Sequence, residues 1–217
     1  MRFQAFLTDL DGTLVHSQDP ICEALEESFR HVGATPPGKQ AIMDMFGLPV
    51  EVMLTTLSEV REDETERIAE FIAEYKRQYP VKMVRAKLIA HAMDTLRCAA
   101  EAGLPICLIT SERRQNASFI LHALELDQYI HYLISRDDVT RFKPDPEPLQ
   151  KAAELVGCRP ETCLYIGESP FDIQAGVAGV YTVAVPSGNW PAHSLLECSP
   201  NLFIQDIQEL QPLFSEG

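Results

Sequence analysis

The hydrophobic pattern of the chain changes near Leu88, and this change limits the folds that the sequence can adopt. Residues 16–84 carry helical periodicity, punctuated by Gly and Pro, and contain no clear strand. Beyond Leu88, short apolar runs alternate with helical segments as far as a closing helix. Such alternation is typical of a parallel sheet with helices on both faces. The apolar run at residues 3–10 supplies one more strand before the helical stretch.

We therefore predict an α/β fold, in which a Rossmann-like parallel sheet carries an inserted helical cap. The core is expected to comprise residues 1–15 and 85–217, and the cap residues 16–84. The expected strands are residues 3–10, 105–110, 131–135, 163–167, 181–185 and 202–204. The expected cap helices are residues 19–31, 38–45, 49–58 and 63–79. The expected core helices are residues 88–102, 113–125, 146–156, one from residue 170, a short one near 191–197 and the closing helix.

Asp19 and Pro20 look like the capping residue and the first helical residue of the first cap helix. The strand at residues 3–10 is expected to be central in the sheet.

The composition narrows the classes of partner. The chain has 217 residues and a formal net charge of −14, so neither nucleic acid nor an anionic membrane is an expected partner. A phosphate substrate stays compatible with this charge, because a metal ion and a lysine can build a local anion site. The six cysteines include no C-x-x-C pair, and the N-terminal segment turns acidic too soon for a signal peptide. We expect a cytoplasmic protein with reduced thiols, while the sequence predicts no oligomeric state.

Polar side chains follow four of the expected strands. The first strand ends in Asp9–Thr13, and the second core strand ends in Thr110 and Ser111. Lys143 lies beyond the third core strand, and the fourth ends in residues 167–172, Gly-Glu-Ser-Pro-Phe-Asp. Ligands of open parallel sheets bind outside the carboxyl ends of the strands. The sequence therefore predicts a functional site that draws on all four segments.

The chemistry of these side chains suggests a role for each. Asp9 is suited to act as a covalent nucleophile, and Asp11 as the general acid and base. Mg²⁺ prefers carboxylates, waters and phosphate oxygens, which the acidic cluster of Asp9, Glu168 and Asp172 would provide. Lys143 and Thr110 would hold the phosphoryl oxygens of the substrate.

Each of these residues also has a purely structural interpretation. Thr110 could cap the helix that follows it, and Lys143 could be an exposed turn residue. Ser169 and Asp172 have the spacing of a capping box, so Asp172 could serve the helix, the site or both. Glu168 could be ordinary polarity at a strand end. The joint occurrence of all of them, in order and at strand ends, favours the catalytic interpretation.

The same residues resemble the motifs of the haloacid dehalogenase superfamily, in its phosphoglycolate phosphatase and pyrophosphatase branch. Asp9–Thr13 match the family's D-x-D-G-T motif in full. Thr110 matches the Ser or Thr that ends the second motif's strand, and Lys143 matches the Lys before Pro. Residues 167–176 match the fourth motif, G-[DE]-S-x-x-D-x-x-A-G. The resemblance spans nearly the whole chain, and its first and fourth motifs are specific.

The resemblance implies a phosphatase that works through an aspartyl-phosphate intermediate under a mobile helical cap. It implies Mg²⁺ held by Asp9, the carbonyl of Asp11 and an acid of the fourth motif, Glu168 or Asp172. The residues expected around the substrate's phosphate are Leu10, Asp11, Thr110, Ser111 and Lys143. One departure concerns the metal, since Glu168 stands where the family more often has Asp.

Several functions stay open at this stage. A sugar-phosphate mutase of the β-phosphoglucomutase type would carry a cap Arg after Gly47 and would lack the acid at Asp172, so the sequence favours a phosphatase. Inorganic pyrophosphatase activity is a further alternative. A silent binding module and a dehalogenase are disfavoured by the intact acids. The expected partner is a small phosphorylated metabolite, with specificity set in the cap near residues 44–51.

Overall fold

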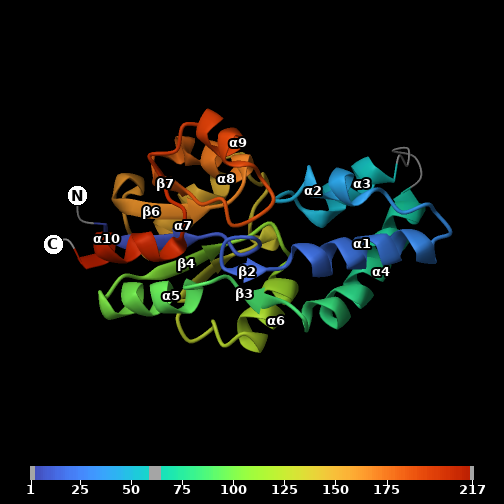
Figure 1. Ribbon diagram of the computed structural model, residues 1–217, viewed down its shortest axis with the longest axis horizontal. Helices are drawn as coiled ribbons and strands as arrows, with labels where there is room; N and C mark the ends of the chain where they lie inside the picture. Colours follow the sequence, from blue (N-terminus) through green and yellow to red (C-terminus); the bar gives the residue numbers. More distant parts are fainter. Residues whose placement is uncertain (1–2, 59–64, 216–217) are drawn as a thin grey trace.

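The computed structural model describes residues 3–58 and 65–215, and its centre is a six-stranded parallel sheet (Figure 1). The strand order is β5-β4-β1-β6-β7-β8, and each neighbouring pair is parallel. The strands are β1 (Ala5–Thr8), β4 (Ile106–Ile109), β5 (Tyr132–Ile134), β6 (Cys163–Gly167), β7 (Tyr181–Ala184) and β8 (Leu202–Phe203). The first strand lies between β4 and β6, so its predicted central position is confirmed. Strands β1, β4 and β6 are buried on both faces, and burial of this kind requires the largely apolar sequences that they have.

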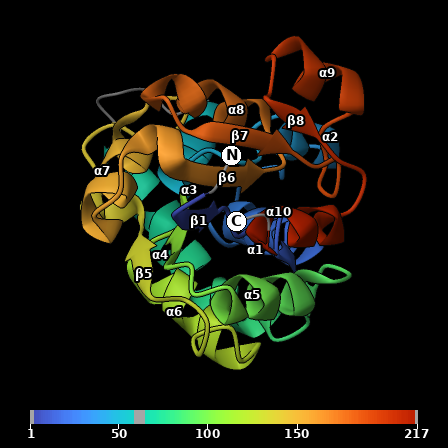
Figure 2. The same cartoon turned by 90° about the vertical axis from the view of Figure 1, so that its left-hand side faces the viewer.

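Helices cover both faces of this sheet, as Figure 2 shows. On one face, Leu7 and Ile109 pack with Leu149 of α7 (Glu147–Val156) and with α8 (Pro170–Ala175). On the other face, α5 (Ala92–Glu101), α6 (Arg114–Ala123) and α10 (Gln211–Ser215) join the main core. A short helix, α9 (Ala192–Glu197), packs beside β7. The predicted α/β fold with a parallel sheet and a helical insertion is confirmed.

Four helices follow β1 and form what we call the helical block, α1 (Gln18–His31), α2 (Lys39–Met43), α3 (Val50–Leu57) and α4 (Thr65–Met83). In Figure 1 the block extends from one end of the sheet. The long helices α1 and α4 pack along each other, and the rings of Phe29 and Phe71 lie 4.7 Å apart between centroids. In the described part of residues 20–80 there is no strand, as predicted.

A two-stranded antiparallel sheet marks the point where the chain enters and leaves the helical block. Strands β2 (Val15–His16) and β3 (Lys87–Leu88) pair with each other, and Val15 lies opposite Leu88. The sequence predicted a helix over 88–102, which was wrong for its first residues, since α5 begins at Ala92. Leu88 is drawn into the pairing with Val15, and residue 91 has a left-handed backbone with φ of 61°.

Two other boundaries differ from the prediction. The capping residue of α1 is Ser17 rather than Asp19, and the Asp19 carboxylate instead accepts a hydrogen bond from Lys39. Helix α4 contains Pro80 and continues to Met83, beyond the expected end at residue 79. The first two residues of that expected helix, 63 and 64, lie outside the described residues. None of the helices in residues 3–58 and 65–215 combines the length and apolar character that a membrane span requires.

Candidate active site

A buried ion pair stands at the carboxyl end of the central strand. Asp9 is the residue after β1, and its Oδ1 lies 2.7 Å from Nζ of Lys143. Lys143 comes from the loop between β5 and α7, and its side chain is only 2% exposed. Lys143 is therefore not a turn residue at the surface, one of its two interpretations from the sequence, but part of the buried cluster. A buried ammonium beside a carboxylate suits the binding of phosphoryl oxygens.

Asp172 is the second carboxylate bound to Lys143. Its Oδ1 lies 2.7 Å from Nζ and accepts a hydrogen bond from the Tyr165 hydroxyl at 2.6 Å. Its Oδ2 accepts hydrogen bonds from the backbone N and the hydroxyl of Ser169. The capping box of α8 is therefore formed, and Asp172 serves the helix and the lysine together. With both oxygens engaged, Asp172 is better placed to position Lys143 than to bind a metal directly.

Asp11 lies in the tight turn between β1 and β2. Gly12 has φ of 82°, a left-handed backbone that glycine adopts without strain. Thr13 donates a hydrogen bond to Asp9 Oδ2 at 3.2 Å, which leaves Asp9 held on both oxygens. Oδ1 of Asp11 is buried without a hydrogen-bond partner in the described residues. A buried acceptor without a partner is costly, and it suggests that a ligand completes this position.

The other residues expected around a phosphate lie nearby, with some of their groups already in use. Thr110 accepts a hydrogen bond from the backbone N of Glu112 at 3.1 Å, but it does not cap α6, whose capping residue is Arg113 without a side-chain hydrogen bond. Ser111 donates to the carbonyl of Gly47 in the helical block at 2.6 Å. The side chain of Leu10 is fully buried in the core, so only its backbone could contact a phosphate.

Glu168 lies in a narrow space between two glycines. Its carboxylate accepts a hydrogen bond from the backbone N of Asn189 at 3.2 Å, and the residue is 1% exposed. A Cβ at Gly12 would lie 2.8 Å from Cγ of Glu168, and a Cβ at Gly188 would overlap its carboxylate. The two glycines thus make room for this side chain.

This edge of the sheet carries more acidic than basic side chains, and burial shifts their pKa values. Burial raises the pKa of Asp9 to about 7, against the effect of Lys143. Burial and the charge of Glu112 raise the pKa of Asp11 to about 7 as well. Burial, with Asp172 and Asp9 nearby, raises the pKa of Glu168 well above its usual range. Burial alone would lower the pKa of Lys143, but the carboxylates of Asp172 and Asp9 outweigh it and keep the ammonium charged.

The carboxyl groups fit a partly hydrated Mg²⁺ rather than an ion enclosed by protein. In the described residues, no group of three or more His, Cys, Asp or Glu side chains forms a ready metal cage. Mg²⁺ usually keeps several waters and takes one or two carboxylates together with substrate phosphate oxygens. The carboxylates of Asp9 and Glu168, together with the backbone carbonyl of Asp11, offer donors of this kind. A cation here would also favour the ionised forms of these carboxyls.

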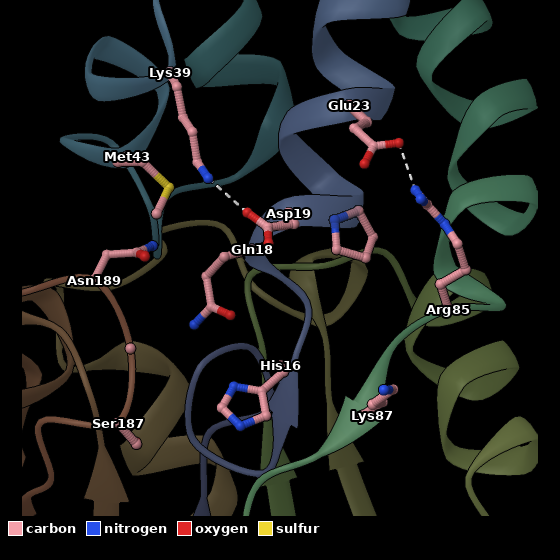
Figure 3. A pocket seen from close by; sticks show the side chains of 12 residues that line it. His16, Gln18, Asp19, Glu23, Lys39, Met43, Arg85, Lys87, Ser187 and Asn189 are labelled. Atoms are coloured by element: carbon pink, nitrogen blue, oxygen red, sulfur yellow. Dashed lines mark hydrogen bonds and ion pairs between the residues drawn. The ribbon is translucent and has the colours of Figure 1, made fainter.

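An open cleft of about 500 Å³ lies outside this cluster, between the helical block and the sheet (Figure 3). On the block side, Lys39 pairs with Asp19, and Arg85 pairs with Glu23. On the sheet side, Ser187 donates a hydrogen bond to the carbonyl of Gly12. The wall of the cleft is therefore in direct contact with the turn that carries Asp11.

A second, smaller cavity lies between Asp9 and the helical block. Asp9, Asp11, Ser111 and Glu112 line it from the sheet side, and residues of α1, α3, α4 and the loop before α3 line it from the block. The free space is about 30 Å³, enough for only a few water molecules. A group bound on Asp9 would thus face a small cavity that the helical block borders.

Several residues of this site were not predicted from the sequence. Tyr165 had a signal, because a tyrosine in a buried strand needs a partner for its hydroxyl, and here that partner is Asp172. Glu112 had a weaker signal, as an acid directly after the polar end of a strand. Tyr75, whose hydroxyl donates to Glu112, had none, because its position depends on how the helical block packs on the sheet.

A parallel sheet with an inserted helical block, and a carboxylate paired with a lysine at its edge, agree with the resemblance to hydrolases of the haloacid dehalogenase type. The family model described as haloacid dehalogenase-like hydrolase matches residues 6–185, most of the chain. The chain therefore belongs to the haloacid dehalogenase-like hydrolase family, which confirms the resemblance seen in its motifs. Membership implies a metal-dependent mechanism and small phosphorylated substrates.

The relatives lie in the subfamily of PpaX pyrophosphatases and phosphoglycolate phosphatase-like proteins, as predicted. A protein of Caldanaerobacter subterraneus described as pyrophosphatase PpaX is 31% identical over 212 residues, covering 97% of this chain and 94% of its own length. Pyrophosphatase PpaX of Bacillus mycoides is 27% identical over 99% of this chain and 98% of its own. The crystal structure of a haloacid dehalogenase-like hydrolase from Bacteroides fragilis superimposes with a TM-score of 0.88 at 26% identity, covering 96% of this chain and 100% of its own. A structure from Haemophilus somnus, described as a phosphoglycolate phosphatase, has a TM-score of 0.87 at 21% identity over 98% of each chain and supports the fold alone.

Proposed function

We propose that the protein is a Mg²⁺-dependent phosphatase that hydrolyses small phosphomonoesters through a phosphorylated Asp9. The observation that carries this proposal is the buried pair of Asp9 and Lys143, 2.7 Å apart, at the bottom of a cavity that also contains Asp11. A carboxylate held beside an ammonium at the end of a central strand is suited to attack a phosphorus atom whose oxygens the ammonium binds.

In the first half of the reaction, an oxygen of Asp9 attacks phosphorus and the bond from phosphorus to the leaving oxygen breaks. Asp11, in its protonated form, gives a proton to that leaving oxygen, so the alcohol departs neutral. The raised pKa of Asp11, about 7, supports a protonated carboxyl in this step. In the second half, Asp11 takes a proton from water as the water attacks the phosphoryl group, and Asp9 is released with phosphate.

The surrounding residues stabilise the charge of the transferred phosphoryl group. Lys143 binds its oxygens, and Asp172 and Tyr165 hold Lys143 in place. Thr110, Ser111 and the backbone of Leu10 complete the phosphate site in this proposal. The carboxylates of Asp9 and Glu168 and the backbone carbonyl of Asp11 would hold Mg²⁺, which neutralises phosphate charge when bound. We further propose that residues 16–84 act as a cap domain on a core of residues 1–15 and 85–217.

Hydrolysis of pyrophosphate is the second candidate reaction, since several relatives are named pyrophosphatase PpaX. Pyrophosphate has the same type of phosphorus centre, so the same residues would act on it. A mutase is less well supported, because residues 47–50 contain no cap Arg and Asp172 is present. We place the enzyme in the cytoplasm, acting on a phosphorylated metabolite and not on nucleic acid.

The test is a phosphate-release screen over small phosphorylated metabolites, including phosphoglycolate, pyrophosphate and sugar phosphates. Each compound is assayed with the wild-type protein, with Asp9→Asn, and after exhaustive removal of divalent cations. We expect release that depends on Asp9 and is restored by added Mg²⁺. Full activity after chelation would contradict the metal requirement, and equal activity in Asp9→Asn would contradict the nucleophile.

A further inference from the structure

The small cavity over Asp9 is acidic on its sheet side and apolar on its block side. Three carboxyl groups line it, those of Asp9, Asp11 and Glu112. The block contributes apolar side chains, among them Phe46 and Met53, together with Tyr75. No Lys, Arg or His is among the described residues that line it. The leaving group of a phosphate ester bound to Asp9 would occupy this cavity.

Glu112 is held in the cavity by groups from both sides. Its Oε1 accepts a hydrogen bond from the Tyr75 hydroxyl at 3.1 Å, and its Oε2 accepts one from the Asn116 amide at 2.7 Å. A carboxylate oxygen has two acceptor positions, so each oxygen keeps capacity for another donor. The residue is 8% exposed, and burial raises the pKa of its carboxyl, so the ionised form is disfavoured unless a cation pairs with it.

Four cationic side chains of the surrounding segments are paired with acids. Lys143 is bound to Asp9 and Asp172 beneath the phosphate position. Arg113, next to Glu112 in the chain, pairs with Glu51 and Asp137. In the open cleft of Figure 3, Lys39 and Arg85 pair with acids of α1. A leaving group with a negative charge would therefore meet carboxyls and no ammonium or guanidinium in the cavity.

We propose that Glu112 selects phosphomonoesters whose leaving group carries an ammonium group, such as the phosphates of small amino alcohols. This inference rests on the proposed function, because it assigns the substrate class of the same site. The ammonium donates to the free acceptor positions of Glu112, while the carbon chain packs against the apolar wall of the block. Leaving groups that carry a carboxylate or a second phosphate are disfavoured, which ranks phosphoglycolate and pyrophosphate below the amino alcohol esters.

The experiment compares three esters that differ in one substituent on a two-carbon leaving group. Phosphoethanolamine carries an ammonium, ethyl phosphate is uncharged there, and phosphoglycolate carries a carboxylate. For the wild-type protein we expect kcat/KM to fall in that order, by about 10-fold or more between the first and the last, the range of a hydrogen bond to a charged group. Pyrophosphate is included as a fourth compound and is expected to rank with phosphoglycolate.

The variant Glu112→Gln keeps the shape of the side chain and removes its charge. We expect it to lose about 10-fold in kcat/KM for phosphoethanolamine while ethyl phosphate changes little. Glu154→Gln, an exposed acid on α7, removes the same charge outside the cavity and should leave the ranking intact. If phosphoglycolate or pyrophosphate is the best wild-type substrate, or if Glu112→Gln leaves the ranking unchanged, the inference is wrong while Asp9-dependent phosphate release still supports the phosphatase. If no compound gives Asp9-dependent release, both proposals fail.

Discussion

At the scale of single residues, the main feature of the site is that its carboxyl groups outnumber the cationic side chains that contact them. Lys143 binds two carboxylates at once, and each of them is also held by hydroxyl donors, Thr13 on Asp9 and Tyr165 on Asp172. Such a network fixes the lysine in one position, so the phosphate site is formed before the substrate arrives. Preformed donors cost no reorganisation during the reaction, which is the main source of electrostatic catalysis.

The nucleophile provides the first prediction. Asp9→Asn should lower phosphate release by at least about 10³-fold, because an amide is a poor nucleophile and loss of a covalent nucleophile is severe in other enzymes. Asp11→Asn should lose about 10²- to 10⁴-fold, the usual contribution of a general acid and base. Thermal unfolding should change little in Asp9→Asn, since Lys143 keeps its bond to Asp172. Near wild-type turnover of Asp9→Asn, measured by phosphate release, would falsify the covalent mechanism.

The glycine beside Glu168 provides the second prediction. A methyl group at Gly188 would overlap the Glu168 carboxylate, so Gly188→Ala should push that carboxylate away from Asp9. We expect the Mg²⁺ concentration for half-maximal activity to rise by roughly 10- to 100-fold, as for other changes next to metal ligands. The matched control is Gly38→Ala, since nothing lies within 4 Å of a Cβ at that position. An unchanged Mg²⁺ dependence in Gly188→Ala would remove Glu168 from the proposed metal site.

At the scale of elements, the sheet and most of the helices could be predicted because each carries its own pattern. Buried parallel strands are apolar runs, and helices of this length show their periodicity within one segment. The pairing of Val15 with Leu88 could not be predicted, because two-residue strands are too short to show alternation and their partners lie far apart in sequence. The cap of α1 was misplaced because Ser17 and Asp19 are both good capping residues.

The site residues at strand ends could be predicted from the sequence, and those that depend on the docking of the helical block could not. Asp9, Lys143 and Asp172 come together as expected, because the ends of parallel strands meet at one edge of the sheet. The contact between Tyr75 and Glu112 depends on the docking of the helical block, for which no local pattern exists. The predicted specificity segment, residues 44–51, does border the cavity over Asp9, whereas Tyr75 and Glu112 on the same cavity were not identified from the sequence.

Two carbonyl groups of the loop before α3 accept hydrogen bonds from the core, in addition to the apolar contacts between the helical block and the sheet. The indole of Trp190 donates to the carbonyl of Phe46 at 3.3 Å, and Ser111 donates to the carbonyl of Gly47 at 2.6 Å. A Cβ at Gly47 would lie 3.0 Å from Oγ of Ser169, so this loop also approaches the segment that holds Asp172 closely. Closure of the block is thereby coupled to the geometry of the phosphate site.

This coupling provides the third prediction. Trp190→Phe keeps an aromatic ring against Phe171 but removes the donor to the loop. Loss of one neutral hydrogen bond, about 0.5–1.5 kcal/mol, should lower kcat/KM by roughly 2- to 10-fold with little effect on thermal unfolding. Amide hydrogen exchange in residues 44–53 should become faster. The control is Tyr132→Phe on β5, a partly exposed ring, and equal behaviour of the two variants would contradict a role for Trp190 in closure.

At the scale of the whole molecule, the position of the helical block and the net charge act together on substrate choice. The block covers the carboxyl edge of the sheet and leaves about 30 Å³ of free space over Asp9. Closure of this kind excludes water and strengthens the electrostatic interactions inside. The formal charge of −14 adds a long-range repulsion of polyanions, which weakens as salt screens it.

The last prediction is that the enzyme rejects large phosphorylated substrates, whatever the chemical groups of their leaving group. A phosphopeptide presents the same phosphorus centre as a small ester, but its chain would hold the block away from Asp9 and leave the cavity open to water. We therefore expect kcat/KM for a phosphopeptide to be lower than that for the best small phosphomonoester by about 10²-fold or more, in line with the cost of misplaced catalytic groups. Adding salt separates the two causes, because it reduces charge repulsion between the acidic protein and an acidic peptide but leaves the steric barrier unchanged. Steady-state kinetics of an acidic and a neutral phosphopeptide at low and high ionic strength would measure both effects. A phosphopeptide with the highest kcat/KM of all compounds would overturn the view of the helical block as a closed cap over a small substrate.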